Sequence, residues 1–305
     1  MKRFILTATW LGCSLAAFTQ WTTNGALNRV AQEWWQWLDR SQPIVIPFRL
    51  EQGIILIQGH SGENTGYFIL DTGAPGLMLN QKVDRTAGKQ LSGITGTLPA
   101  DELSDAKLDL GNLHLEKLPA LAMDLGRFER ALQLPVAGLI GHDVLKNFEI
   151  MLDYNNRILM LWQADNDQVM HPRNQIRFEM QQHLPIIEVQ IGDRKLQLAV
   201  DSGAESNILH RKWRRKLGNQ HFNFVETAHI QSPNDALAPV EAGVVPVTKV
   251  KGMDFFKMRY LSADLGPLCR RGRLKLDGLL GFPFLSAGLI SINFQQRTLY
   301  VWEKK

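Results

Sequence analysis

The chain has 305 residues, enough for about two domains that each bury a core of their own. Hydrophobic residues make up 45% and charged residues 21%, which excludes a disordered chain and a protein with many membrane spans. With 34 basic and 30 acidic residues, the net charge of +4 is too small to indicate a nucleic-acid-binding protein. Its cysteines, Cys13 and Cys269, exclude a cysteine-rich zinc site.

Residues 1–20, MKRFILTATWLGCSLAAFTQ, have the composition of an export signal or a membrane leader. The segment begins with basic residues, continues as an apolar stretch from Phe4 to Phe18, and carries small residues where a peptidase could cut. That stretch is shorter than the roughly 20 residues needed to span a bilayer. We therefore expect an exported protein, periplasmic or secreted, and keep as the alternative a membrane-anchored protein that faces outside the cytoplasm.

Residues 21–42 predict a short amphipathic helix that is rich in tryptophan, followed by a linker. Leu27, Val30, Trp34 and Leu38 recur at helical spacing. The tryptophans could rest in a membrane interface or pack on the folded body. The charges of the helix sum to zero, which favours packing, and membrane association through this segment stays the alternative. The segment could equally be a pro-segment, a lid or an anchor.

From residue 43 onward the chain predicts strands and turns, and its two halves repeat each other. Short apolar runs rich in Ile, Val and Leu are broken by Gly, Asn, Asp and Pro. Phe68–Asn80, FILDTGAPGLMLN, matches Leu198–His210, LAVDSGAESNILH. Val136–Trp162 then matches Leu276–Trp302 without a gap, with Gly, Leu, Arg and Trp identical at several positions. Such a repeat indicates a duplicated unit.

The repeat divides the body into two lobes, residues 43–163 and 176–305, joined by the polar linker 164–175. We predict an all-β, bilobal fold with a short N-terminal helix. A duplicated lobe related by an approximate twofold axis would bring equivalent turns together at the interface.

Each lobe carries one Asp-Thr/Ser-Gly-Ala turn, at Asp71 and Asp201. In each, an apolar strand delivers a carboxylate to a tight turn that glycine permits. Two carboxylates in contact share one proton, so that one donates while the other accepts. A water between them could attack a peptide carbonyl without any metal or cofactor. The sequence lacks the H-E-x-x-H and G-x-S-x-G motifs of other hydrolases.

On these residues the chain resembles the aspartic proteases of the pepsin and retropepsin superfamily. The D-T-G-A and D-S-G-A turns are similar to the retroviral motif, and Leu139-Ile140-Gly141 and Leu279-Leu280-Gly281 are similar to the elements that brace each catalytic turn. The resemblance covers about residues 43–303 and places the chain beside the bacterial retropepsin-like group, with two lobes in one chain. It implies a pepsin-like fold of two acid-protease lobes and an aspartic endopeptidase, a hydrolase that acts on a peptide or protein substrate.

The resemblance also implies a role for each residue of the two turns. Asp71 and Asp201 would be the catalytic dyad, and the residues that support the turns would be Thr72, Gly73, Ser202 and Gly203. Ala74 and Ala204 stand where pepsins usually carry Ser or Thr, so a hydroxyl that would stabilise the ionised dyad is missing. We therefore expect a dyad that is less acidic than that of the gastric enzymes and works in weakly acidic conditions.

The flap that closes over substrate in this family corresponds to Leu91–Leu98, LSGITGTL. Its mobile tip would be Gly93, Ile94, Thr95 and Gly96, and it lacks the tyrosine that pepsins carry. The equivalent stretch of the second lobe, near His229 to Pro239, contains no glycine.

Two other functions remain open: a catalytically silent peptide-binding protein of the same fold, and a membrane-tethered processing factor. The basic run Arg211–Lys216, RKWRRK, fits a solvated helix face better than an anionic partner. Asp143 and Asp277, which flank the bracing glycines, are interpreted as structural. We predict a monomer that binds no nucleic acid, no metal and no cofactor.

Overall fold

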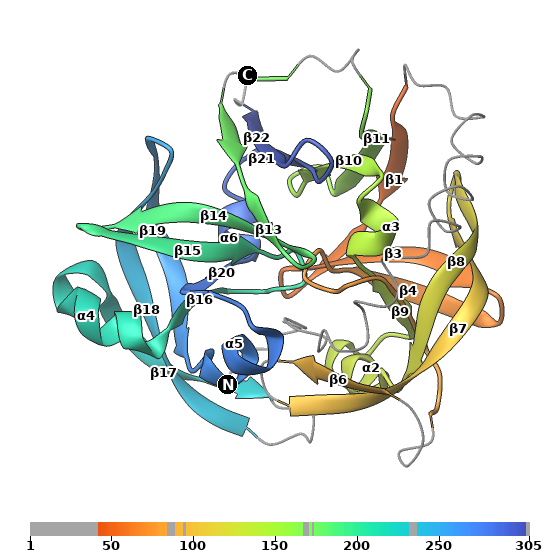
Figure 1. Ribbon diagram of the computed structural model, residues 1–305, viewed down its shortest axis with the longest axis horizontal. Coiled ribbons are helices and arrows are strands. Elements are labelled where there is room, and N and C mark those ends of the chain that lie inside the picture. Colours follow the sequence, from red (N-terminus) through yellow and green to blue (C-terminus); the bar gives the residue numbers. More distant parts are fainter. Residues whose placement is uncertain are drawn as a thin grey trace.

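The structure is a computed structural model that describes residues 42–83, 89–93, 96–166, 171–172, 174–231 and 237–302. The chain is mainly β-sheet with barrel-like curvature, which confirms the all-β expectation (Figure 1). The predicted leader, residues 1–20, and the tryptophan-rich helix lie outside the described residues. Within the described ranges, every helix is too short or too polar to cross a membrane.

The first half of the body forms an eight-stranded sheet with the order β2-β3-β4-β9-β5-β8-β7-β6. Its strands are β2 (Arg49–Glu51), β3 (Ile54–Ser61), β4 (Asn64–Leu70), β5 (Leu77–Asn80), β6 (Lys89–Gly93), β7 (Gly96–Leu110), β8 (Leu113–Met123) and β9 (Val136–Ile140). Two short helices, α2 (Gly126–Leu132) and α3 (His142–Leu145), flank β9 in the chain.

The second half forms an eight-stranded sheet with the order β13-β14-β15-β20-β16-β19-β18-β17. Its strands are β13 (Glu179–Gln181), β14 (Leu184–Ile191), β15 (Arg194–Val200), β16 (Asn207–His210), β17 (Asn223–Gln231), β18 (Leu237–Val250), β19 (Met253–Ala263) and β20 (Gly278–Leu280). The helices of this half are α4 (Arg211–His221), α5 (Gly266–Gly272) and α6 (Phe282–Leu285). Taken strand by strand, the order is the same as in the first half.

A third sheet contains strands from both halves, in the order β1-β11-β10-β21-β22-β12. Its strands are β1 (Ile44–Pro47), β10 (Phe148–Asp153), β11 (Ile158–Gln163), β12 (Gln175–Arg177), β21 (Leu289–Asn293) and β22 (Thr298–Trp302). The halves meet where β10 pairs with β21 in antiparallel register. Figure 1 shows this sheet across the top of the view, above the two larger sheets.

The repeated sequence segments form the middle of each large sheet. β9 and β20 are buried along their whole length, as expected for apolar runs that lack alternation. Their repeated glycines leave room for a neighbouring strand: a Cβ on Gly138 would lie 2.3 Å from the Met78 carbonyl oxygen, and one on Gly278 would lie 2.2 Å from that of Ile208. The identical glycines therefore have a packing reason.

Three apolar clusters of described residues hold the fold together. One lies within the first half, around Leu139 and Phe128, and one within the second, around Leu279 and Leu268. The largest contains residues of both halves, including Phe148 of β10, and it continues into the shared sheet. Burial of apolar surface therefore stabilises the contact between the halves as well as each half.

Candidate functional site

The two aspartate turns start at equivalent places in the two large sheets. Asp71 follows β4 and Asp201 follows β15, each a central strand. The backbone N–H of Asp71 donates to the Ile140 carbonyl at 3.0 Å, and that of Asp201 donates to the Leu280 carbonyl at 3.0 Å. Each turn is therefore held by a hydrogen bond to the last residue of a repeated apolar strand, β9 in the first half and β20 in the second.

Thr72 and Ser202 connect the two turns across the interface. The Thr72 N–H donates to Ser202 Oγ at 3.0 Å, and the Ser202 N–H donates to Thr72 Oγ1 at 2.9 Å. Ser202 Oγ in turn donates to the Leu70 carbonyl at 2.9 Å. The structure thus brings together the two hydroxyl residues that the sequence singled out, although 130 residues separate them.

Gly73 and Gly203 let the opposite carboxylate approach the backbone. A Cβ on Gly203 would lie 2.4 Å from Asp71 Cγ, and a Cβ on Gly73 would lie 2.6 Å from Asp201 Cγ. Both distances are shorter than real Cβ contacts, so a larger residue would displace the carboxylates. Each glycine N–H also donates to the aspartate of its own turn, at 2.9 Å to Asp71 Oδ1 and 2.8 Å to Asp201 Oδ1.

Both aspartates are completely buried, with exposed fractions of 0%. Burial, reinforced by the charge of Asp201, raises the pKa of Asp71 well above its usual range. Burial also raises the pKa of Asp201, to about 6. The second oxygen of each carboxyl, Oδ2, has no hydrogen-bond partner among the described residues. A proton shared by the two carboxyls would serve both oxygens.

A histidine that no sequence motif marks also contacts this site. His183 lies in the turn between β13 and β14, and its Nε2 donates to the Gly73 carbonyl at 2.8 Å. Burial, together with the charge of His142, lowers the pKa of His183 to about 4, so the ring is neutral at physiological pH. His183 is 110 residues from Gly73, and no local motif marks it. Only the packing of the halves reveals this contact.

Replacing His183 by glutamine should remove one acid-sensitive part of the fold's stability. The neutral ring is favoured in the folded state, so its contribution is complete above the ordinary histidine pKa of 6.5 and is lost as the pH falls toward 4. Glutamine keeps a donor but does not titrate. In urea unfolding, the free energy of unfolding of the wild type should fall between these pH values, and that of H183Q should fall by roughly 2–3 kcal/mol less. An acid loss of the same size in H183Q would contradict this assignment.

A buried tyrosine just after a strand of the shared sheet lies near Asp201. Tyr154 follows β10, and its ring packs edge-on against Phe48 and Phe282 at centroid distances of 6.0 and 5.4 Å. Burial, and then the nearby charge of Asp201, raises the pKa of Tyr154. The phenol oxygen has no hydrogen-bond partner within the described part of the chain. The carboxyl pair therefore has an apolar, aromatic neighbour on this side.

The segment expected to be a flap forms a hairpin. β6 pairs with β7, and Gly93 faces Gly96 across it. Ile94 and Thr95, the other two expected tip residues, lie outside the described residues. α5 of the second half contacts β6. In the second half, β17 and β18 form the corresponding hairpin, in which Gln231 faces Leu237.

Asp143 and Asp277 lie outside the carboxyl pair and bind basic or N–H groups. Lys146 Nζ lies 2.8 Å from Asp143 Oδ1. Burial alone would raise the pKa of Asp143, but His142 and Lys146 outweigh it and lower that pKa. Asp277 accepts from Trp213 Nε1 at 2.6 Å and lies 2.8 Å from Lys212 Nζ.

The basic run lies on α4, where acidic residues meet several of its charges. Lys212 contacts Asp277, Arg211 lies 3.3 Å from Asp264, and Arg214 lies 2.7 Å from Glu241. Such pairs are typical of a solvated helix face. Among the described residues, no group of three or more His, Cys, Asp or Glu side chains is arranged to hold a metal ion.

Comparison with known proteins gives a similarity of fold. No family model matches the chain, and no curated protein matches it. Among solved structures, it is similar to the basic 7S globulin from soybean, with a TM-score of 0.50 and 10% sequence identity. The match covers 85% of this chain and 94% of the globulin chain.

This match corrects the function that the sequence resemblance implied. The similar structure is a globulin, and the assignment of this chain to the aspartic proteases was wrong. Three expectations that followed from this assignment were also wrong: endopeptidase activity, classification as an enzyme, and the description as a hydrolase or aspartyl protease. A physical reason agrees with the correction: the motif predicted the turns but could not show that both carboxyls are closed off from solvent.

Proposed function

We propose that the protein is a non-catalytic binding protein that takes an extended peptide on the free edge of one of its sheets. Its body would be a bilobal duplication of the pepsin type, with lobes 43–163 and 176–305 and the linker 164–175. The matching strand order of the two large sheets supports this duplication. So does the repeat of sequence between the halves.

The observation that carries the proposal is the exposed edge formed by β17. Within the part of the chain that the structure describes, this nine-residue strand is the last of its sheet and pairs only with β18, with a register shift between Phe224 and Glu226. Two large apolar side chains on it, Phe224 and Val225, are 52% and 58% exposed. A free edge presents unpaired backbone N–H and C=O groups, which an added strand can pair with. Apolar side chains beside such an edge favour a peptide with apolar residues.

The enclosed carboxyl pair argues that a bound peptide is not cut. With both carboxyls fully buried, an attacking water and a peptide carbonyl have no access to them in this structure. Recognition would take place at the sheet edge, and the carboxyl pair would belong to the interface between the lobes.

Binding to a library of unstructured peptides tests the proposal. We expect F224K/V225K to weaken binding of a selected apolar peptide at least about 10-fold, because charged residues block strand addition. F256K is the matched control, since Phe256 is 68% exposed but lies on β19, where the adjacent Phe255 packs against Phe284 of α6. We expect F256K to bind like the wild type, and mass spectrometry to find the bound peptide intact.

Several results would contradict this function. Equal loss of binding in F224K/V225K and F256K would mean that general surface hydrophobicity, and not the edge, captures the peptide. If the wild type cleaved the peptide and D201N did not, the protein would be catalytic. A dimer that dissociates in F224K/V225K would identify a second copy of the chain as the occupant of the edge.

We also propose that residues 1–20 direct export, so that the folded body acts as a monomer outside the cytoplasm. The basic start, apolar stretch and small residues of that segment support this. N-terminal sequencing of protein recovered from cell fractions tests it: a cleaved chain in the soluble fraction supports export, and an intact chain in the membrane fraction supports the anchor.

A further inference from the structure

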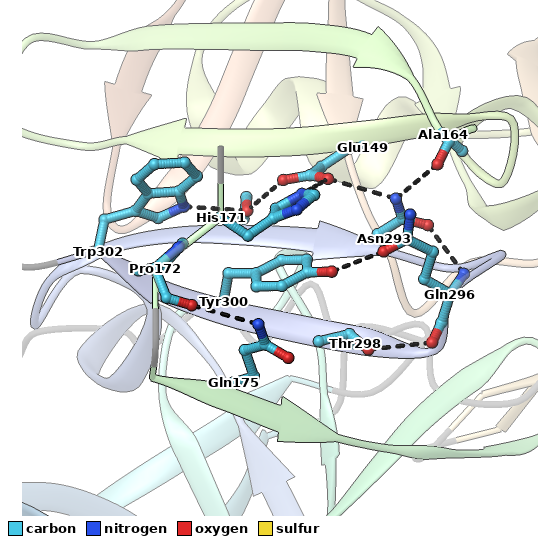
Figure 2. Close-up of polar contacts among 11 residues, drawn as sticks. Glu149, Ala164, His171, Pro172, Gln175, Asn293, Gln296, Thr298, Tyr300 and Trp302 are labelled. Atoms are coloured by element: carbon cyan, nitrogen blue, oxygen red, sulfur yellow. Dashed lines mark hydrogen bonds and ion pairs between the residues drawn. The ribbon is translucent and has the colours of Figure 1, made fainter. Parts of the chain in front are cut away.

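A buried acidic residue lies on the strand by which the two halves meet. Glu149 is on β10 and is 1% exposed. Across the junction, Ser291 Oγ of β21 donates to Glu149 Oε1 at 2.7 Å, and Asn293 Nδ2 donates to Glu149 Oε2 at 3.3 Å. Figure 2 shows the Asn293 side chain approaching the Glu149 carboxylate from the neighbouring strand. The carboxylate thus bridges the halves.

The third group on this carboxylate comes from the linker. His171 Nε2 lies 2.7 Å from Glu149 Oε2, and the histidine side chain is 16% exposed. Its ring stacks on Tyr300 of β22, with centroids 3.9 Å apart and planes 14° apart, and it lies beside Trp302. Figure 2 shows the imidazole between the carboxylate and the tyrosine ring. An acid and two aromatic rings therefore form a cradle for a cationic ring.

The cradle is held in place by its own hydrogen bonds. Trp302 Nε1 donates to Ser291 Oγ at 3.0 Å, which leaves the serine proton for Glu149. The Tyr300 hydroxyl donates to Gln296 Oε1 at 2.6 Å. Asn293 Nδ2 also donates to the carbonyl of Ala164, at the start of the linker, at 2.8 Å. The linker is thus attached to this sheet at two points.

The charges around Glu149 make the protonation of His171 the variable element. Trp162 of β11 and Asn293 of β21 lie opposite Glu149 in the sheet and carry no charge. From β22 the titratable group is Tyr300, whose pKa burial and the charge of Glu149 raise, so the phenol stays neutral. From β12 the charged group is Arg177, which donates to the Gln296 carbonyl at 3.0 Å. Histidine is the residue type that ordinarily changes charge between about pH 5 and 8, and His171 is the histidine in the described part of the chain that contacts Glu149.

We propose that Glu149 and His171 form a proton-dependent clasp that fixes the linker against the sheet shared by the two halves. A protonated imidazole makes a charge-assisted hydrogen bond with the carboxylate, roughly twice as strong as a neutral one. Loss of that proton leaves a buried carboxylate with neutral donors alone, which is a less favourable environment for a charge. The clasp is therefore tight in mildly acidic solution and loosens on the alkaline side. This inference does not depend on the proposed peptide-binding function.

A double-mutant cycle measures the clasp directly. H171F keeps a ring that can stack on Tyr300 but has no donor, and E149Q removes the charge. From unfolding of the wild type, both single variants and the double variant, we expect the two residues to couple by roughly 10-fold or more in the folding equilibrium constant at pH 6. The coupling should fall several-fold at pH 8. A coupling that does not change with pH overturns the proposal.

The pair His114 and Asp109 supplies a matched control cycle. Their atoms approach to 2.6 Å, like those of the clasp, but the side chains are 67% and 25% exposed. We expect H114F and D109N to couple by less than about 5-fold at either pH, because solvent screens an exposed pair. A control pair that couples as strongly as the clasp would show that burial and the cradle contribute nothing.

Cleavage of the linker gives a second readout that does not require E149Q to fold. Cutting by trypsin after Arg173 is followed by mass spectrometry through the new end that it creates there, and its rate is normalised at each pH to cleavage of a short peptide. We expect the wild type to be cut several-fold more slowly at pH 6 than at pH 8. We expect H171F to be cut at the same rate at both pH values. The same is expected of H171Q, whose side chain keeps a donor but does not titrate. A pH difference that persists in H171F would overturn the clasp.

Discussion

Replacing Asp71 by asparagine should stabilise the folded protein at neutral pH. In the folded state the pKa of both aspartates is raised, so folding favours protons on the pair. Their contribution is complete below the ordinary aspartate pKa of 3.8 and is lost as the pH rises through the folded value, about 6 for Asp201. Asparagine removes one of the two charges, and its amide can donate to Asp201. We expect D71N to gain roughly 2–3 kcal/mol in free energy of unfolding at pH 7.

Urea unfolding between pH 4 and 8 checks this expectation. The wild type should lose stability as the pH rises through about 6, the folded pKa of Asp201, and D71N should lose much less. D143N is the matched control, because the pKa of Asp143 is lowered by its partners and the same substitution should destabilise the protein at pH 7. If D71N were less stable than the wild type at neutral pH, the two carboxyls would not repel each other as the structure indicates.

Replacing Gly203 by alanine should strongly destabilise the protein. The new methyl group would lie 2.4 Å from Asp71 Cγ and 2.5 Å from Asp71 Oδ1, inside a fully buried contact between the halves. The Asp71 carboxylate accepts a hydrogen bond from the Gly73 N–H, and the Gly203 N–H donates to Asp201, so neither group can move without losing a hydrogen bond. We expect a loss of about 3 kcal/mol in free energy of unfolding, at the upper end of overpacking effects.

The first turn supplies the control for this substitution. A Cβ on Gly76 would meet its nearest atom, Asp143 Cβ, at 3.5 Å, which is an ordinary contact, so G76A should change stability by less than about 1 kcal/mol. Adding D71A to G203A removes the atoms that the methyl group would meet, and the two changes should be sub-additive by about 1–2 kcal/mol. Strict additivity would mean that Gly203 is required for another reason.

The correction of function shows what a motif can and cannot predict. The two aspartate turns are local: a strand of apolar residues, an acid, a hydroxyl and a glycine specify each of them. Whether water and substrate reach the acids depends on what covers them. Tyr154, which follows β10 of the shared sheet, lies near Asp201, and no residue near Asp71 or Asp201 in sequence predicts this neighbour.

The sequence by itself determined the all-β class, the repeat between the halves and the residues of the two turns. Strand periodicity, turn chemistry and a duplicated segment can each be recognised within a short stretch of sequence. Tertiary structure alone decided that both carboxyls are enclosed, that His183 reaches the Gly73 carbonyl, and that Glu149 meets His171 between the halves. Burial and pKa depend on which distant segments pack together, and contacts over such separations leave no periodic signal in a single chain.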